Sequence, residues 1–413
     1  MKELLPKISF NILMLLVASI PTFRSLSPIL IVLFAVVSIA HGVVNKAFEI
    51  NNKKVFFAGI AFFLIHLLSV IYSEQKGVAW FDIEVKLSLI VFPILFSIRN
   101  EYIIKNSKYI FISFSAVTII ANIYLLSTSF YNTEIVDIWH MNRDETWNFS
   151  SSNLSQYIHP SYLSMYNLFA LVYLVKTILE ERNKTRFLLI IPSLFLVLEI
   201  FLLQSKAGFM ALAAVLMYIT FLLYLKIKNK LLKLALPIII LAVSAYAISQ
   251  NYRMQIMFKS LVEIVKTGDS KSSSTGARFE IWKATLNVVG RNTLLGVGAG
   301  DIKPEMYKEY DKIKTNSEEV EENHYNVHNQ FLETMLGQGL IGFGLLIFLL
   351  FAALYQALKN KDHLLAMFIL IIILNFFPES MLNQQAGVVF FAFFYYLMTL
   401  TLYKKNGIRQ NEV

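Results

Sequence analysis

The sequence predicts an all-α polytopic membrane protein with about twelve transmembrane helices and one large, partly helical loop. Of its 413 residues, 56% are hydrophobic and 14% are aromatic, whereas soluble domains are roughly 45–50% apolar. The apolar residues gather in many runs of about 18–22 residues, the length at which a helix spans a bilayer. The connections between the runs are alternately rich and poor in Lys and Arg. Together these observations favour a bundle of membrane-spanning helices.

Twelve apolar runs are expected to span the membrane. The fourth run begins among Asp82, Glu84 and Lys86, so its start is the least apolar. The first run follows Lys2 and Lys7 as a signal peptide would, but it lacks a convincing cleavage site and another run follows at once, so we expect it to be retained. The predicted spans are residues 8–23, 26–44, 55–72, 85–98, 109–130, 158–178, 187–204, 206–225, 231–249, 338–358, 363–378 and 386–403.

The distribution of basic residues predicts the orientation. Lys and Arg are frequent at both termini and after every even-numbered span. The short segments on the opposite side carry only Arg24, Lys76, Lys86, Arg143 and Lys206. By the positive-inside rule, both termini are expected to lie in the cytoplasm. The same bias accounts for the net charge of +9 without nucleic-acid binding, and the absence of cysteine excludes disulfides, thiolate metal sites and cysteine nucleophiles.

This topology divides the chain into four parts. Residues 1–249 hold spans one to nine with an outer loop at 131–157, residues 250–337 form the large periplasmic loop, residues 338–403 hold the last three spans, and residues 404–413 are a cytoplasmic tail. Within the large loop, the segment TGARFEIWKATLNVV predicts a helix with Thr275 as its N-cap. We expect its apolar face to consist of Phe279, Trp282, Leu286 and Val289.

Cationic residues near the outer face are candidates for binding phosphate. Arg278 lies four residues before Trp282, and Arg291 precedes a glycine-rich turn at residues 296–300, whose amides could bind phosphate oxygens or form a plain tight turn. Lys206 lies between two apolar runs at the membrane edge, where a cation is costly and is a functional candidate unless it snorkels to the interface. Arg278 could equally be a solvated loop residue.

His328 and Asn329 form a polar pair just before the tenth span, where a histidine can contact both water and lipid headgroups. The imidazole could act as a base or could merely cap the helix. His159 precedes Pro160 at the start of the sixth span, where a capping role is as plausible as a functional one. Glu379 and Gln384 lie in the last outer loop, where the Glu379 carboxylate could be a base or could merely face the lipid headgroups. With His159, Trp282 and Asn329, these two residues are the candidates for contacting substrate.

Two further sets of polar residues lie outside these groups: Glu199, and His324 with the acidic run before it. Glu199 lies inside the seventh span, where we expect it to be paired within the bundle. His324 follows the acidic run at residues 318–322, which could bind a metal but is more typical of a solvated face. The sequence has no Asp-x-Asp cluster, so neither a metal nor a cofactor is predicted.

The residues around His328 resemble the bacterial O-antigen ligase family, whose domain is shared with O-antigen polymerases. His328-Asn329 is followed by nine residues, 330–338, and then by Gly339-Leu340-Ile341-Gly342, which matches the family's histidine motif in full. Arg278, Ile281-Trp282 and residues 295–298 resemble its Arg, Ile-Trp and Leu-Gly-Val-Gly pattern. Residues 205–208 resemble its Ser-Arg-Gly motif, although Lys206 replaces the arginine and keeps only the charge.

The resemblance implies a helical, family-C type glycosyltransferase that works at the periplasmic face. Its donor would be a glycan on undecaprenyl diphosphate, its acceptor lipid A–core or another glycan, and membrane lipid would surround both. Cations must stabilise the departing diphosphate and a base must accept the proton of the acceptor hydroxyl. Arg278, Lys206 and Arg291 fit the first role. His328 fits the second, although as a cation it could instead bind phosphate.

Three alternative functions remain. An O-antigen or capsule polymerase would join lipid-linked repeat units with nearly the same residues. A protein O-oligosaccharyltransferase would transfer the glycan to a polypeptide. A transporter, the alternative from a non-enzyme class, would carry charged residues from several spans in the centre of the bundle, whereas the candidates here lie near the outer edge.

Overall fold

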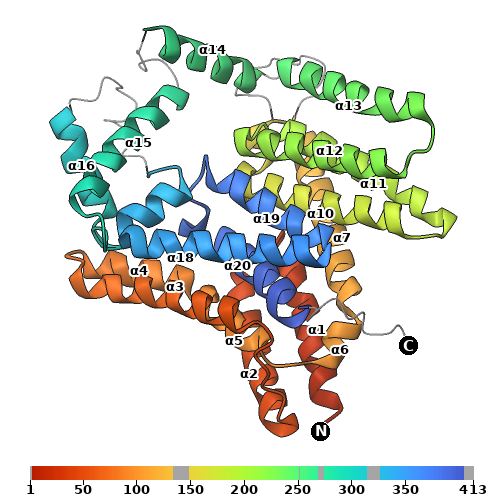
Figure 1. Ribbon diagram of the computed structural model, residues 1–413, viewed down its shortest axis with the longest axis horizontal. Helices are drawn as coiled ribbons and strands as arrows, with labels where there is room; N and C mark the ends of the chain where they lie inside the picture. The colour runs from red at the N-terminus through yellow and green to blue at the C-terminus, as the bar shows by residue number, and fades with distance from the viewer. Residues whose placement is uncertain (1, 134–147, 251, 268–273, 314–325, 404–413) are drawn as a thin grey trace.

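The computed structural model describes residues 2–133, 148–250, 252–267, 274–313 and 326–403. Its named elements are all helical, and they follow one another as a bundle with a helical excursion between α13 and α18 (Figure 1). The elements before this excursion are α1 (Leu4–Ser19), η1 (Arg24–Leu26), α2 (Ser27–Asn45), α3 (Lys53–Tyr72), α4 (Lys76–Lys86), α5 (Ser88–Phe96), α6 (Glu101–Lys105), α7 (Ser107–Tyr131), α9 (Ser151–Leu154), α10 (Pro160–Glu180), η2 (Lys184–Leu189), α11 (Ile190–Leu202), α12 (Lys206–Lys226) and α13 (Lys230–Gln250).

The excursion and the C-terminal part supply the remaining elements. Helix α18 is the longest, and it begins well before the span that the sequence predicts at residues 338–358. These elements are α14 (Tyr252–Thr267), α15 (Ser274–Arg291), α16 (Ile302–Ile313), α18 (Gln330–Asn360), α19 (His363–Phe376), η3 (Met381–Asn383), α20 (Gln385–Tyr396) and the π-helical turn η4 (Leu397–Thr401).

Seven helical stretches of the described residues are long and apolar enough to cross a membrane: Arg24–Asn45, Lys53–Tyr72, Ser107–Tyr131, Pro160–Glu180, Lys184–Leu202, Lys206–Leu225 and Gln330–Asn360. Three shorter apolar helices accompany them, at Leu4–Ser19, His363–Phe376 and Gln385–Thr401. The chain is therefore a multi-pass membrane protein. A helix occupies each of the twelve predicted runs, but the number of complete crossings remains a prediction.

The fourth predicted span differs from the structure. Instead of one helix over residues 85–98, α4 ends at Lys86 and α5 occupies only Ser88–Phe96. Lys86 is buried and pairs with Asp82 one turn earlier, whereas Glu84 is exposed. The sequence alone gave no reason to place Lys86 in the interior.

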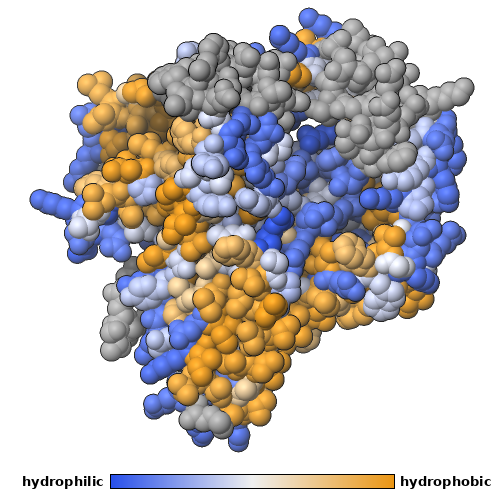
Figure 2. Space-filling view, turned by 180° about the vertical axis from the view of Figure 1, so that it is seen from behind, coloured by the Kyte–Doolittle hydropathy of each residue, from blue (hydrophilic) through white to orange (hydrophobic). Residues whose placement is uncertain are grey.

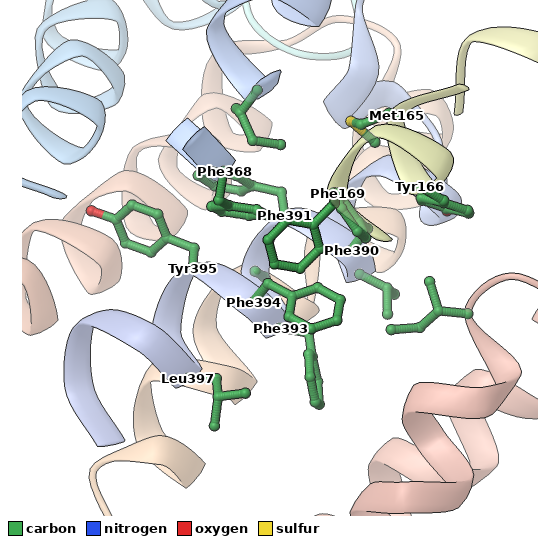
Figure 3. Packing of buried hydrophobic residues seen from close by; sticks show 14 of the residues in the cluster. Met165, Tyr166, Phe169, Phe368, Phe390, Phe391, Phe393, Phe394, Tyr395 and Leu397 are labelled. Atoms are coloured by element: carbon green, nitrogen blue, oxygen red, sulfur yellow. The ribbon is translucent and has the colours of Figure 1, made fainter. Parts of the chain in front are cut away.

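Aromatic side chains fill the centre of the bundle. Phe169 of α10, Phe368 of α19 and Phe390 and Phe394 of α20 contact one another through tilted and edge-to-face rings (Figure 3). Such ring pairs contribute about 0.5–1.5 kcal/mol each beyond the burial of their area. The core therefore fixes α20 against α10 and α19, and with it the segment between α19 and α20.

The outside of the bundle is apolar. Helix α2 exposes Ile29, Val32, Leu33 and Val36, and Figure 2 shows a broad hydrophobic surface over the lower part of the molecule, where α1 and α2 lie. A soluble protein rarely exposes contiguous apolar surface of this kind, whereas a membrane protein presents it to lipid.

Helices α15 and α16 pack at the end of the bundle at which α18 begins, which we call the loop end (Figure 1). Ala277, Ile281, Ala284 and Val288 of α15 form a small core there with residues of α16 and the start of α18. The predicted apolar face of α15 is thus partly wrong, because Phe279 and Leu286 are exposed at 46% and 54%. Ala277 and Ala284, rather than Phe279 and Leu286, face α16 and α18, and their small side chains allow close packing.

Candidate functional site

The site is built where α18 begins. Asn329 is the N-cap of α18, and its side-chain oxygen accepts the backbone N–H of Leu332 at 3.0 Å. His328 precedes the cap with φ +48, a left-handed conformation that is uncommon outside glycine. The cap is therefore Asn329 and not His328. Asn329, predicted to contact substrate, uses its side chain to hold the helix end.

Glu379, from the segment between α19 and α20, bridges the two principal candidates. One of its carboxylate oxygens lies 3.2 Å from Nδ1 of His328, and the other accepts a hydrogen bond from Nη2 of Arg278 at 3.0 Å. The side chains of His328, Glu379 and Arg278 are 24%, 18% and 20% exposed, so the cluster is partly open to an incoming molecule. The structure thus brings together three residues that the sequence suggested only separately.

The electrostatics of Glu379 follow from this arrangement. Burial by itself would raise the pKa of its carboxyl, but the hydrogen bond from His328 and the positive charges of Arg278, His328 and His159 outweigh burial. The pKa of Glu379 therefore lies below its ordinary value. Glu379 is an anion at neutral pH and can hold an N–H of the imidazole.

A set of hydrogen bonds fixes Glu379 relative to α18. The hydroxyl of Ser380 accepts the backbone N–H of Asn329 and donates to Glu333, both at 3.2 Å. The Asn383 side chain donates to the other oxygen of Glu333 at 2.7 Å. The backbone N–H of Leu382 donates to the side chain of Gln330 at 2.6 Å. We call this group the 330–383 clasp; the residues that form it were not predicted, since their pairing joins segments about fifty positions apart.

Trp282 positions the backbone that precedes His328. Its indole N–H donates to the carbonyl oxygen of Val327 at 3.0 Å, and Val327 is fully buried. Trp282 was predicted to contact substrate. In this structure its polar atom is used to hold the residue next to the histidine.

Lys206 lies beside the first turn of α15. Its ammonium donates to the hydroxyl of Thr275 at 3.2 Å, and Ser205 caps α12 by accepting the backbone N–H of Gly208. Thr275 lies within α15, one residue after its start, so its hydroxyl is not the predicted N-cap. Since Thr275 and Arg278 are three residues apart, they share one face of α15. The contact therefore places Lys206 on the Arg278 side of the site.

The glycine-rich turn does not bind phosphate through its amides. The N–H groups of residues 296–300 all donate within the protein: Gly296 to Asn292 O, Val297 to Leu336 O, Gly298 to Gly337 O, Ala299 to Ser69 Oγ and Gly300 to Ser73 Oγ. Gly298 has φ +95, and a Cβ there would lie 2.4 Å from the Ser73 hydroxyl. The turn therefore joins α18 to the end of α3, which is the plain structural alternative.

Arg291 lies at the far end of α15 from Arg278. Thirteen residues separate them, which at 1.5 Å per residue is roughly 20 Å of helix. Arg291 forms an ion pair with the buried Glu309 of α16, which also accepts from Asn287 at 3.1 Å. The structure does not bring Arg291 to the His328 cluster, because the pairing of α15 with α16 holds it elsewhere.

His159 and Gln384 lie at the edge of the site. His159 is exposed at the N-cap of α10, where its ring nitrogen accepts the N–H of Ser161 at 3.4 Å, and its charge reaches Glu379. Gln384 is exposed at the N-cap of α20, without a side-chain cap hydrogen bond. Tyr162, one turn after His159, is nine-tenths buried and lies within electrostatic range of Glu379. In the sequence, the position of Tyr162 one helical turn after His159 was the one feature that could have suggested a place for Tyr162 near the site.

Several ionisable groups lie inside the bundle. Lys86, His66 and Glu333 are buried, and the Lys86–Asp82 pair lies within electrostatic range of both His66 and Glu333. None of these three buried groups was among the candidate site residues that the sequence placed near the outer edge. Glu199 is fully buried, and neither carboxylate oxygen has a hydrogen-bond partner within the described residues, so the expected pairing is not observed there.

Metal ligands are the remaining question for the site. Residues 134–147 of the first loop, His324 and the acidic run at 318–322 lie outside the described residues. Across the part of the chain that the structure does describe, no group of three or more His, Cys, Asp or Glu side chains is arranged to hold a metal ion.

The geometry defines a class: a helical, multi-pass membrane protein with a histidine–carboxylate–arginine cluster at one end of its bundle. Residues 191–347 match the family model described as O-Antigen ligase, which confirms the resemblance seen around His328. This segment contains Lys206, Arg278 and His328, whereas Glu379 lies beyond it. This part of the chain is therefore similar to the O-antigen ligase family.

A relative from Haemophilus influenzae (strain ATCC 51907 / DSM 11121 / KW20 / Rd) matches over a longer stretch. It is 22% identical over 322 residues, which cover 76% of this chain and 75% of the relative, and it is described only as an uncharacterized protein. It therefore extends the similarity beyond the family segment without adding a substrate.

Proposed function

We propose that the protein is an O-antigen ligase that moves a glycan from undecaprenyl diphosphate to lipid A–core at the periplasmic face of the inner membrane. The observation that carries this proposal is the Glu379 carboxylate, which contacts both His328 and Arg278. One cluster then contains a candidate base and a candidate cation for the leaving group, the two groups that glycosyl transfer from a diphosphate requires.

The roles follow from the hydrogen bonds. When Nδ1 of His328 donates its proton to the Glu379 carboxylate, the lone pair is on Nε2, as in a catalytic triad. As Nε2 takes the proton of the acceptor hydroxyl, the acceptor oxygen bonds to the anomeric carbon. The bond from that carbon to the diphosphate oxygen breaks, and undecaprenyl diphosphate leaves with the electron pair. Glu379 stabilises the imidazolium that results.

Arg278 and Lys206 are proposed to receive the diphosphate. Arg278 presents a guanidinium whose fork suits phosphate oxygens, and its present partner, Glu379, marks where an anion is held in the absence of substrate. Lys206 adds a second positive charge beside the same face of α15. Because charge grows on the diphosphate as the bond breaks, these contacts act mainly in the transition state.

The orientation and the span count complete the proposal. The basic residues of the connections support cytoplasmic termini and a periplasmic position for the loop end. Helices in all twelve predicted runs support a twelve-span protein of the family-C glycosyltransferase type. Arg291, held by Glu309, is given no role in the diphosphate site.

Reconstitution with a purified lipid-linked glycan tests the function. Three acceptors are offered in turn: lipid A–core, a second carrier-linked repeat unit, and a peptide. We expect transfer to lipid A–core. Transfer only to the carrier-linked repeat would identify a polymerase, transfer only to the peptide a protein O-oligosaccharyltransferase, and no transfer to any acceptor by the folded protein would contradict glycosyl transfer.

A further inference from the structure

Helix α15 is held at both ends at the level where apolar spans begin. Near its start, the hydroxyl of Thr275 accepts a hydrogen bond from Lys206, the first residue of α12. Just past its end, the carbonyl oxygen of Thr293 accepts the backbone N–H of Leu340 at 2.9 Å, directly after the kink of α18. From these two points α12 and α18 each continue for about twenty residues, the length that crosses the hydrocarbon core of a bilayer.

The length of α15 fits a position along the membrane surface. Its 18 residues extend for about 27 Å at 1.5 Å per residue. The helix is not among the described stretches that are apolar enough to cross a membrane. A helix fixed at both ends to the starts of two spans runs across them, so α15 lies along the boundary between membrane and water.

The side of α15 that faces away from its own core is apolar. Ala277 and Ala284 belong to the small core with α16 and α18. Phe279 and Leu286 each follow one of these alanines by two positions, which places them roughly 200° around the helix. Both side chains are exposed. Since seven residues separate Phe279 from Leu286, they form one stripe along the helix.

The stripe adjoins the apolar outside of the bundle. Leu294 and Leu295, which follow α15, are exposed, and so are Leu340 and Ile341 of α18. The carbonyl oxygen of Leu294 accepts the backbone N–H of Ile341 at 3.5 Å, so the two pairs are neighbours. Farther along, α18 exposes Phe348, Phe351 and Tyr355. The surface that α18 presents to lipid therefore extends to the end of α15.

A basic residue borders the stripe. Lys283 is exposed, and it lies one turn after Phe279, roughly 40° around the helix from it. A lysine can lay its methylene chain along apolar surface while its ammonium reaches the phosphates of lipid headgroups. An apolar stripe with a lysine at its edge is typical of helices that lie in the membrane interface.

We propose that α15 is seated in the membrane surface, with Phe279 and Leu286 among the acyl chains of the leaflet at the loop end and Lys283 at the phosphates of anionic lipids. Arg278 lies roughly 100° around the helix from Phe279. The seating therefore holds its guanidinium at headgroup depth, where the diphosphate of a lipid-linked substrate lies. Only this consequence for Arg278 rests on the proposed function; the seating itself does not.

Spin labelling of the protein in lipid nanodiscs tests the seating. Because the chain has no cysteine, the variants Phe279→Cys and Leu286→Cys each carry a single nitroxide. The measurement compares nitroxide collisions with O2, which concentrates among acyl chains, and with a water-soluble nickel chelate. The ratio of O2 to nickel collisions should be close to that of Phe351→Cys, on the apolar outside of α18. Lys308→Cys, on the exposed side of α16, is the matched water control and should give a much lower ratio.

A ratio at Leu286→Cys as low as that at Lys308→Cys would overturn the seating. Lys283→Cys serves if the apolar variants fail to accumulate, because an exposed lysine should tolerate the label. Its ratio should lie between those of Phe351→Cys and Lys308→Cys, and a ratio equal to that of Lys308→Cys would contradict the proposal.

The lipid composition tests the headgroup contact. In Lys283→Glu, the label at Leu286 should move toward water in discs that contain phosphatidylglycerol, but not in discs of phosphatidylcholine alone. Equal ratios in the two lipids would overturn the contact with anionic headgroups. The labels report the seating without substrate, so lipid-exposed labels in a protein that transfers nothing would contradict the proposed function alone. Water-exposed labels in an active transferase would contradict the seating alone.

Discussion

Glu379 lies 3.2 Å from Nδ1 of His328, although 51 positions separate the two residues along the chain. The contact depends on the 330–383 clasp, which holds the segment before α20 against the first turn of α18. A carboxylate in this position favours the imidazole tautomer that carries its proton on Nδ1. The proposed base is therefore a pair of residues, not a single one.

Glu379→Gln should lower the rate of transfer by roughly 10²–10⁴-fold, the range of general-base assistance. Glutamine keeps the shape but loses the charge that stabilises the imidazolium. Because the pKa of Glu379 is below its ordinary value, its carboxylate is ionised throughout the neutral range, so the variant should be slow at every pH in that range. A full rate in the variant would show that Glu379 does not act through His328.

Arg278→Ala should lose most transfer, because a cation that neutralises the leaving diphosphate acts chiefly in the transition state. Lys206→Ala should also lose activity, whereas Lys206→Arg should retain it if the position needs only positive charge. Initial rates at saturating substrate provide the measurement. Arg291→Ala is the control on the same helix, and it should transfer nearly normally because Arg291 pairs with Glu309 away from the cluster. Full activity of both alanine variants at normal expression would remove Arg278 and Lys206 from the site.

Gly339→Ala should destabilise the protein. Gly339 kinks α18 with φ +64, and a Cβ there would lie 2.2 Å from the carbonyl oxygen of Leu294. At φ +64 and ψ −163 the backbone is in a region populated essentially by glycine, and an alanine there costs about 1–3 kcal/mol before this clash is added. Gly344→Ala is the matched control in the same helix, because its Cβ would meet nothing within 4 Å and it should gain about 0.5–1 kcal/mol. Thermal unfolding in detergent compares them, and equal Tm values would show that the kink is dispensable.

A cysteine at Lys283, exposed on α15, should react with an impermeant thiol reagent in intact cells whose outer membrane is permeabilised. A cysteine at Lys228, between α12 and α13, should react only after the inner membrane is lysed. The chain has no cysteine of its own, so each label reports one position. The reverse pattern would place the loop end in the cytoplasm and exclude the proposed donor side.

Helical content and the motif around His328 could be predicted because both depend on local sequence. Apolar runs specify membrane helices by their length, and the motif from His328 to Gly342 carries its own spacing. The partners of these residues could not be predicted in this way. Glu379 meets His328 only because the clasp joins distant segments, and Lys86 is buried where α4 packs against η3 and α20.

The glycine turn and Arg291 are the converse case, because their sequence suggests an anion site that tertiary contacts within the protein occupy. Gly296–Gly300 has the composition of a phosphate loop, but every amide in it donates within the protein: to Asn292, to Ser69 and Ser73 at the end of α3, or to the α18 backbone. Arg291 lies near this turn in sequence, yet α16 supplies the carboxylate that holds it. Composition identifies groups able to bind an anion, whereas tertiary contacts decide which of them are available.

The pH dependence of transfer by wild type and His328→Ala tests the central claim most directly. If His328 is the base, the alanine variant should fold and insert normally but transfer roughly 10²–10⁴-fold more slowly. The wild-type rate should fall as the pH is lowered and the imidazole takes up a proton, and the variant should lack this limb. A wild-type rate that falls as pH rises would assign His328 to phosphate binding as a cation. A near-normal rate in the variant, with the profile unchanged, would contradict a catalytic His328 altogether.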